Sequence, residues 1–119
     1  MNQLENTALF FKSLSEPVRL RILNLLIHAE HEICVCDLMT VLEVPQSAIS
    51  RHLAYLRKAN LVNARREGVW MHYSISPTLN ALSQSILQIL KDHSSMYLIL
   101  AEDLLKQSGN GCCEQNIEL

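Results

Sequence analysis

The sequence predicts a mainly α-helical protein with one small β-hairpin, arranged as a winged helix-turn-helix that dimerises through its terminal helices. Apolar residues recur every three or four positions over most of the chain, which is typical of amphipathic helices. A Glu-Val-Pro turn at 43–45 separates two helical segments, and an Arg-Arg-Glu-Gly run at 65–68 joins two alternating segments. The length of 119 residues suits one such domain, expected over 1–107, with a flexible cysteine-containing tail over 108–119.

Two helices are expected in the N-terminal part of the chain. Apolar side chains at helical spacing predict the first over residues 3–13. Ser15 is the expected N-cap of the second helix, and Pro17 stands in its first turn, where a missing N–H costs nothing. We expect this helix to continue to Ala29.

The centre of the chain predicts a short helix, a turn and a longer helix. The short helix is expected over 35–42. Pro45 ends it, because the residue before a proline is driven away from helical dihedral angles. The longer helix is expected over 46–59, with Asn60 after it in the left-handed conformation that Asn tolerates. Its buried stripe is predicted to contain Ile49, Leu53 and Leu56.

The C-terminal half predicts two strands and one long helix. The strands are expected over 61–65 and 69–75, with the turn at Glu67-Gly68, where glycine supplies freedom of φ. A single helix is expected over 78–107. It carries more apolar residues than a small domain can cover, so we expect a homodimer that uses this helix.

The formal net charge of −2 averages two regions of opposite sign. Residues 46–73 carry five basic side chains and one acidic side chain, a net charge of +4, whereas the remainder carries −6. A basic centre between acidic flanks indicates a surface that meets a polyanion. We expect this partner to be double-stranded DNA.

The predicted helix over 46–59 fits the major groove, where polar and basic side chains at its N-terminal end reach base edges. The hairpin tip would reach backbone phosphate or the minor groove. The residues expected to contact DNA are Gln46, Ser47, Ser50, Arg51, His52 and Tyr55 on the helix, and Arg65 and Arg66 on the hairpin. His52 has a second interpretation, because its place between Ile49 and Leu56 equally suits a packed, hydrogen-bonded side chain.

Several classes of protein are not supported by the sequence. No nucleophile–base pair, P-loop or phosphate-cradling glycine-rich loop is visible, so we do not expect an enzyme. The N-terminus lacks the basic and apolar regions of a signal peptide, and the stretch over 69–90 contains too many polar residues for a membrane span. We therefore expect a cytoplasmic protein with no membrane partner.

The residues at 50–53 and 56–62 resemble the recognition helix of the ArsR/SmtB metalloregulatory repressors. The runs at 14–23 and 67–73 are similar to the second helix and the wing of that family, and the resemblance extends from about Leu9 to Leu105. Asn60 departs from the pattern, which usually has glycine there. The resemblance implies a homodimer that represses its own operon without a cofactor and leaves operator DNA when a toxic metal or metalloid binds.

A Cys-Val-Cys-Asp-Leu run that begins at Cys34 resembles the arsenic-sensing motif of the same family. Thiolates suit soft ions, and trivalent arsenic and antimony take three ligands. In a regular helix, Cys34 and Cys36 would point about 200° apart, so they hold one atom only if the first helical turn distorts. Such a distortion would displace the helix that packs against the DNA-reading helix and would end repression.

The third ligand of such a site has three interpretations, because Met39 stands where the family often has a third cysteine. Cys112 or Cys113 completes the site in the preferred interpretation, since the chain from Gln107 to Cys112 spans ~17 Å when extended. In the second, a hydroxide or buffer thiol joins two protein thiolates. In the third, the inducer is an organic trivalent arsenical that needs only two.

Other roles for these residues remain open at this stage. A cadmium, lead or zinc sensor would want four ligands, and no cysteine precedes Cys34. A redox or persulfide sensor would use the cysteine pairs as a reversible disulfide. In the alternative interpretation, Cys34 and Cys36 only pack as small buried apolar residues, and the thiols of the tail have no function. The polar residues of the last helix are expected to form a solvated face: Asp92, His93, Glu102 and Asp103.

Overall fold

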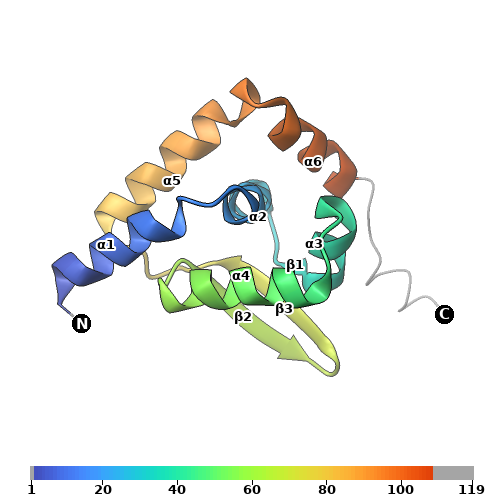
Figure 1. Cartoon of the computed structure of the whole chain (residues 1–119), viewed down its shortest axis with the longest axis horizontal. Coiled ribbons are helices and arrows are strands. Elements are labelled where there is room, and N and C mark those ends of the chain that lie inside the picture. Colours follow the sequence, from blue (N-terminus) through green and yellow to red (C-terminus); the bar gives the residue numbers. More distant parts are fainter. Residues whose placement is uncertain (1, 109–119) are drawn as a thin grey trace.

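The computed structural model describes residues 2–108, and its fold class is the predicted winged helix-turn-helix (Figure 1). Its elements are α1 (Gln3–Ser13), α2 (Pro17–His28), β1 (Ile33–Cys34), α3 (Val35–Leu42), α4 (Gln46–Lys58), β2 (Val62–Glu67), β3 (Trp70–Ile75), α5 (Ala81–His93), the 3-10 helix η1 (Ser94–Met96) and α6 (Leu98–Ser108). We call β2, β3 and the turn between them the wing. Within residues 2–108, none of the helices combines the length and the hydrophobicity that a membrane span requires.

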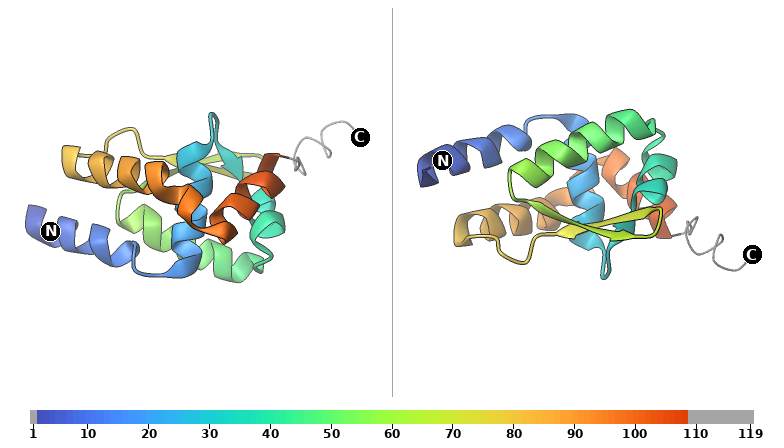
Figure 2. Two further views of the ribbon diagram at one scale, coloured as in Figure 1. Left: turned by 90° about the horizontal axis from the view of Figure 1, so that it is seen from above. Right: turned by 90° about the horizontal axis from the view of Figure 1, so that it is seen from below.

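Helix α2 lies at the centre of the molecule. In Figure 1 it is seen nearly end-on, with α5 and α6 arched over it and α4 and the wing below. This placement buries five consecutive residues of α2, from Ile22 to Leu26, because neighbours surround the helix on several sides. The wing tip and α3 lie at one end of the molecule, and the starts of α1 and α5 lie at the other (Figure 2).

The start of α2 differs from the prediction. Glu16, and not Ser15, is the N-cap, and its side chain accepts a hydrogen bond from the backbone N–H of Arg19 at 2.8 Å. The hydroxyl of Ser15 instead donates to the carbonyl of Lys12 at 2.7 Å. The prediction of Ser15 was wrong because Pro17 occupies the first helical position, which makes the residue directly before it the cap.

The sheet has one strand more than predicted. The hairpin is confirmed, with Gly68 at its tip in the left-handed region (φ 60°) and the second strand beginning one residue later than expected. The additional strand, β1, pairs antiparallel with β3 and gives the order β1-β3-β2. In this register Ile33 is opposite Tyr73, and Cys34 is opposite His72. A strand of two residues has no periodicity from which it could be predicted.

The expected single helix over 78–107 is wrong, because η1 divides it into α5 and α6. At the break, the hydroxyl of Ser94 donates to the carbonyl of Lys91 at 3.0 Å and lies 3.1 Å from Nε2 of His28. Serine side chains compete with helical backbone bonds in this way. The break turns the chain back, so that α6 contacts both α2 and α3.

A buried ion pair holds α6 in this position. The guanidinium of Arg21 on α2 donates two hydrogen bonds of 2.9 Å to the carboxylate of Asp103 on α6. Asp103 is only 1% exposed, so the prediction that it belongs to a solvated face was wrong. The bond to Asp103 also raises the pKa of Arg21 above its usual value. A second, exposed pair joins Lys106 of α6 to Glu43 after α3 at 3.5 Å.

Candidate DNA-reading face and cysteine pair

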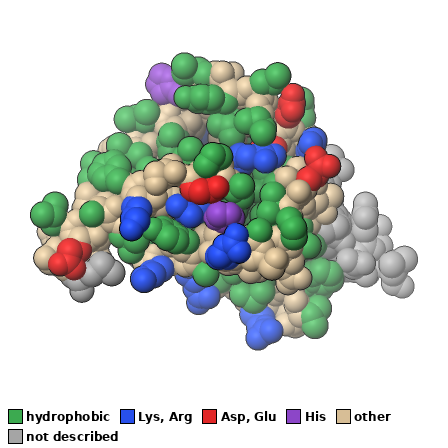
Figure 3. Space-filling view, in the orientation of Figure 1, with side chains coloured by type: hydrophobic (Ala, Val, Ile, Leu, Met, Phe, Trp, Pro, Cys, Tyr) green, Lys and Arg blue, Asp and Glu red, His purple; other side chains and the backbone are tan. Residues whose placement is uncertain are grey.

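Helix α4 has a buried side and a polar side, as the sequence predicts. Ile49, Leu53 and Leu56 are each 0% exposed and join the core. Pro45 is the N-cap, and Asn60 takes the expected left-handed conformation (φ 63°) after the last turn. The side chains at the N-terminal end that we expected to reach base edges are all exposed: Gln46, Ser47, Ser50 and Arg51. Lys and Arg side chains gather on the same part of the surface, over α4 and the wing (Figure 3).

His52 and Tyr55 are half-buried and contact the start of α2. Nδ1 of His52 lies 3.7 Å from the carboxylate of Glu16, the residue that also caps α2. The guanidinium carbon of Arg19 lies 4.1 Å from the centroid of the Tyr55 ring, within cation–π range. These contacts support the packed interpretation of His52. The sequence did not predict these contacts of Glu16 and Arg19, because their partners lie 36 positions further along the chain.

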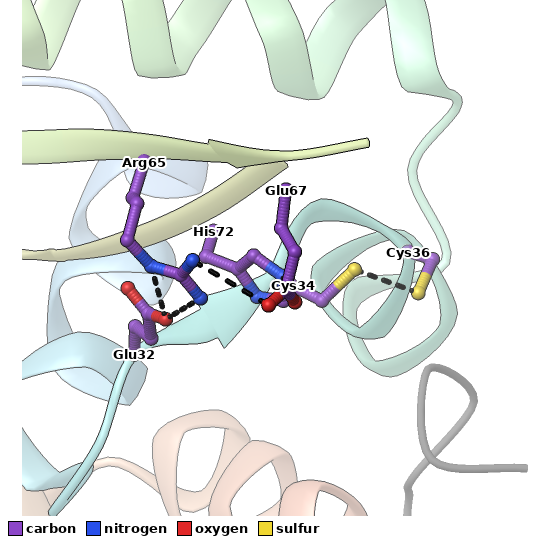
Figure 4. Close-up of polar contacts among 6 residues, drawn as sticks. All are labelled: Glu32, Cys34, Cys36, Arg65, Glu67 and His72. Carbon is purple, nitrogen blue, oxygen red and sulfur yellow. Dashed lines mark hydrogen bonds and ion pairs between the residues drawn. The ribbon is translucent and has the colours of Figure 1, made fainter. Parts of the chain in front are cut away.

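The two wing arginines lie in different surroundings. Arg66 is exposed near the tip. Arg65 is held by acidic side chains: its guanidinium donates from Nε to Glu32 at 2.8 Å and also from Nη2, and Nη1 lies 3.7 Å from Glu67 (Figure 4). The hydrogen bond between Glu32 and Arg65 lowers the pKa of the carboxyl group and raises the pKa of the guanidinium. The sequence contains no signal for this pairing.

Cys34 and Cys36 converge at the junction of β1 and α3. Their sulfur atoms are 3.0 Å apart, well under the ~4.6 Å that two metal–sulfur bonds of ~2.3 Å can span (Figure 4). Helix α3 has the expected bounds, so the ~200° separation of two residues within a regular helix does not apply to this pair. Cys34 precedes α3 with an extended backbone (φ −71°, ψ 144°), so the sulfurs meet with no distortion of the helix.

The cysteine pair lies at the N-terminal end of α3. Cys34 is the N-cap of α3 and Cys36 lies in its first turn, where the helix dipole favours anions. Cys34 is buried, Cys36 is half-buried, and Sγ of Cys36 lies 4.0 Å from Oδ1 of Asp37. Thiolates are the form of cysteine that binds soft metal ions.

Of the positions relevant to a third ligand, the structure describes only Met39. Met39 is half-buried and packs against the core. Cys112 and Cys113 lie outside the described residues. Ser108 of α6 lines a cavity of about 650 Å³ together with Ile33 and Asp37, which are sequence neighbours of Cys34 and Cys36. Within residues 2–108, no three His, Cys, Asp or Glu side chains are arranged to hold a metal ion.

The terminal helices leave an apolar surface uncovered. A cavity of about 620 Å³ with mostly apolar walls lies between α2, α5 and α6. Large exposed apolar patches mark interaction surfaces in soluble proteins. Large apolar side chains are exposed on α1 and along the segment from α5 to α6. They are Leu4 and Phe11 of α1, Leu82 and Ile89 of α5, Met96 of η1, Tyr97, and Leu98, Ile99 and Leu105 of α6.

Comparison with known proteins agrees with this geometry. The profile of the family described as "Bacterial regulatory protein, arsR family" matches residues 16–64. The arsenic resistance transcriptional regulator ArsR2 of Pseudomonas putida is 42% identical over 88 residues, which cover 74% of this chain and 76% of the relative. The chain belongs to the ArsR family. This ArsR-family protein is also 46% identical over 77 residues to the arsenical resistance operon repressor of Escherichia coli K12, covering 65% of each chain.

Solved structures support the same assignment. A homodimeric winged helix-turn-helix DNA-binding domain from Mycobacterium bovis, described as a possible ArsR-family regulator, has a TM-score of 0.62 and 29% identity. The match covers 77% of this chain and 83% of that domain. The family consists of transcriptional regulators, and the relatives of this ArsR-family protein include repressors.

Proposed function

We propose that this ArsR-family protein is a repressor that binds double-stranded operator DNA as a homodimer and leaves it when trivalent arsenic or antimony bonds to Cys34 and Cys36. The observation that carries the proposal is the 3.0 Å separation of the two sulfur atoms. They lie at the start of α3, the helix that contacts α4. An atom bonded to both sulfurs would therefore lie at the start of the helix that supports the DNA-reading helix.

In this proposal α4 enters the major groove. The exposed polar residues of its first two turns read base edges, while Arg65 and Arg66 contact the DNA backbone from the wing. His52 and Tyr55 border this face and hold α4 against α2. The apolar surface of α1, α5 and α6 supplies the dimer contact, which would place two copies of α4 on neighbouring half-sites.

The third ligand is proposed to come from Cys112 or Cys113. The support is the cavity that Ser108 shares with Ile33 and Asp37, the sequence neighbours of Cys34 and Cys36. The alternatives are a hydroxide or buffer thiol as third ligand, or an organic arsenical that requires two thiolates. They are distinguished by comparing arsenite with a methylated trivalent arsenical on the Cys112→Ser/Cys113→Ser variant.

The proposal is tested by fluorescence anisotropy of a labelled duplex taken from directly upstream of the gene. The protein–DNA complex is titrated with arsenite, antimonite, cadmium, zinc and peroxide. We expect release by arsenite and antimonite. Release by peroxide alone would support a thiol redox sensor instead, and release by cadmium or zinc alone would support the divalent-metal alternative.

Replacing Arg51 by Ala should weaken specific DNA binding by about 1–3 kcal/mol, because one good side-chain contact to a base contributes that much discrimination. The same anisotropy assay measures this loss. Lys91→Ala is the matched control, since it removes one exposed positive charge on α5, away from α4. Equal affinities for Arg51→Ala and Lys91→Ala would contradict a base contact by Arg51.

A further inference from the structure

Glu32 connects the cysteine pair to the wing. It lies two residues before Cys34, and its carboxylate accepts two hydrogen bonds from Arg65 of β2. Figure 4 shows the carboxylate of Glu32 and the guanidinium of Arg65 facing each other beside the cysteine pair. The bond crosses from the chain before β1 to the far strand of the sheet, because the strand order is β1-β3-β2.

The connection continues through the backbone of the sheet. Cys34 is opposite His72 of β3, and His72 is opposite Arg65 of β2. Glu67 lies between the side chains, 3.7 Å from Nη1 of Arg65 and 3.3 Å from Nε2 of His72. Cys34 is therefore joined to the wing by β-sheet pairing, and Glu32, two residues before it, is joined to the wing by side-chain contacts.

Arg65 has two possible anionic partners in this arrangement. Its guanidinium is bonded to Glu32 in the structure, while the proposed function requires it at a DNA phosphate. Carboxylate and phosphate oxygens compete for the same fork of N–H donors. The side chain of Arg65 is 51% exposed, so a phosphate can approach it without any rearrangement of the core.

We propose that Glu32 is a positioning residue that competes with DNA for Arg65 and transmits the state of the cysteine pair to the wing. When an inducer atom joins Cys34 to Cys36, β1 holds Glu32 on Arg65 and withdraws Arg65 from DNA. When the site is empty, Arg65 exchanges to phosphate. The competition rests on the ion pair and on the proposed contact of Arg65 with DNA, and its control by an inducer rests on the proposed inducer site as well.

The test is the affinity of Glu32→Gln for the upstream duplex and for an unrelated duplex of the same length, with and without arsenite. Without arsenite, we expect binding about two- to fivefold tighter than wild type on both duplexes, the range of an exposed ion pair. With arsenite, DNA binding by the variant should weaken by a smaller factor than binding by wild type. Glu30→Gln is the matched control, because it removes an exposed carboxylate in the same loop.

A double-mutant cycle assigns the effect to Arg65. The gain from Glu32→Gln should disappear in the Arg65→Gln background and persist in the Arg66→Gln background. Equal gains from Glu32→Gln and Glu30→Gln, or a gain that survives in Arg65→Gln, would overturn the competition. If arsenite weakens DNA binding by the same factor in Glu32→Gln and in wild type, the transmission step is overturned. If arsenite does not release the wild-type protein, the proposed function fails, while the comparison without arsenite still decides the competition.

Discussion

Cys36→Ser should retain DNA binding and lose release by arsenite. Cys36 lies in the first turn of α3 and is only half-buried, so the smaller hydroxyl leaves the helix and the reading face of α4 intact. Serine stays protonated at neutral pH and is a hard ligand, so one soft bond to the metalloid is lost. The affinity of the site for arsenite should fall by more than the ~10–100-fold seen when a residue that only supports a metal ligand is changed, because Cys36 is itself a proposed ligand.

Anisotropy on the upstream duplex measures both properties of Cys36→Ser in one titration. Met39→Leu is the matched control, because it changes a sulfur-containing residue on the same helix and keeps both thiols. We expect Met39→Leu to respond to arsenite like wild type. Full release of a Cys34→Ser/Cys36→Ser variant by arsenite would place the inducer site elsewhere in the protein.

Arg21→Met should destabilise the fold by about 3–5 kcal/mol, the cost of leaving one member of a buried ion pair without its partner. Asp103 is almost fully buried on α6 and receives both of its 2.9 Å hydrogen bonds from Arg21. In the variant this carboxylate either stays buried without its cationic partner or pulls α6 away from α2. Urea unfolding at a fixed protein concentration measures the loss, since dimer formation also contributes to stability.

Two further variants separate the buried charge from simple loss of packing. Arg21→Met/Asp103→Leu should recover most of the stability, because apolar side chains of similar volume often replace a buried ion pair without loss. Lys106→Ala breaks the exposed pair with Glu43 and should cost no more than about 1 kcal/mol. A loss below about 1 kcal/mol for Arg21→Met would contradict a stabilising role for the buried pair.

The candidate site illustrates where sequence reasoning stops. The cysteine motif and the exposed polar end of α4 were visible as local patterns of residue type and spacing. The geometry of the cysteine pair was not, because a two-residue strand places Cys34 in extended backbone and only β3, some 40 residues later, holds that strand. The pairing of Arg65 with Glu32 and the contact of Tyr55 with Arg19 were hidden for the same reason.

The sequence by itself determined the features that depend on neighbouring residues. These are the helix over Gln3–Ser13, the turn at Pro45, the buried stripe of α4 and the left-handed Asn60. Side-chain periodicity and backbone preference act within a few residues, so the chain alone specifies them. Only the tertiary structure decided that α6 turns back, that Asp103 is buried, and that the two sulfurs meet beside the wing. These features depend on contacts between residues up to 82 positions apart, whose formation depends on how all the helices pack together.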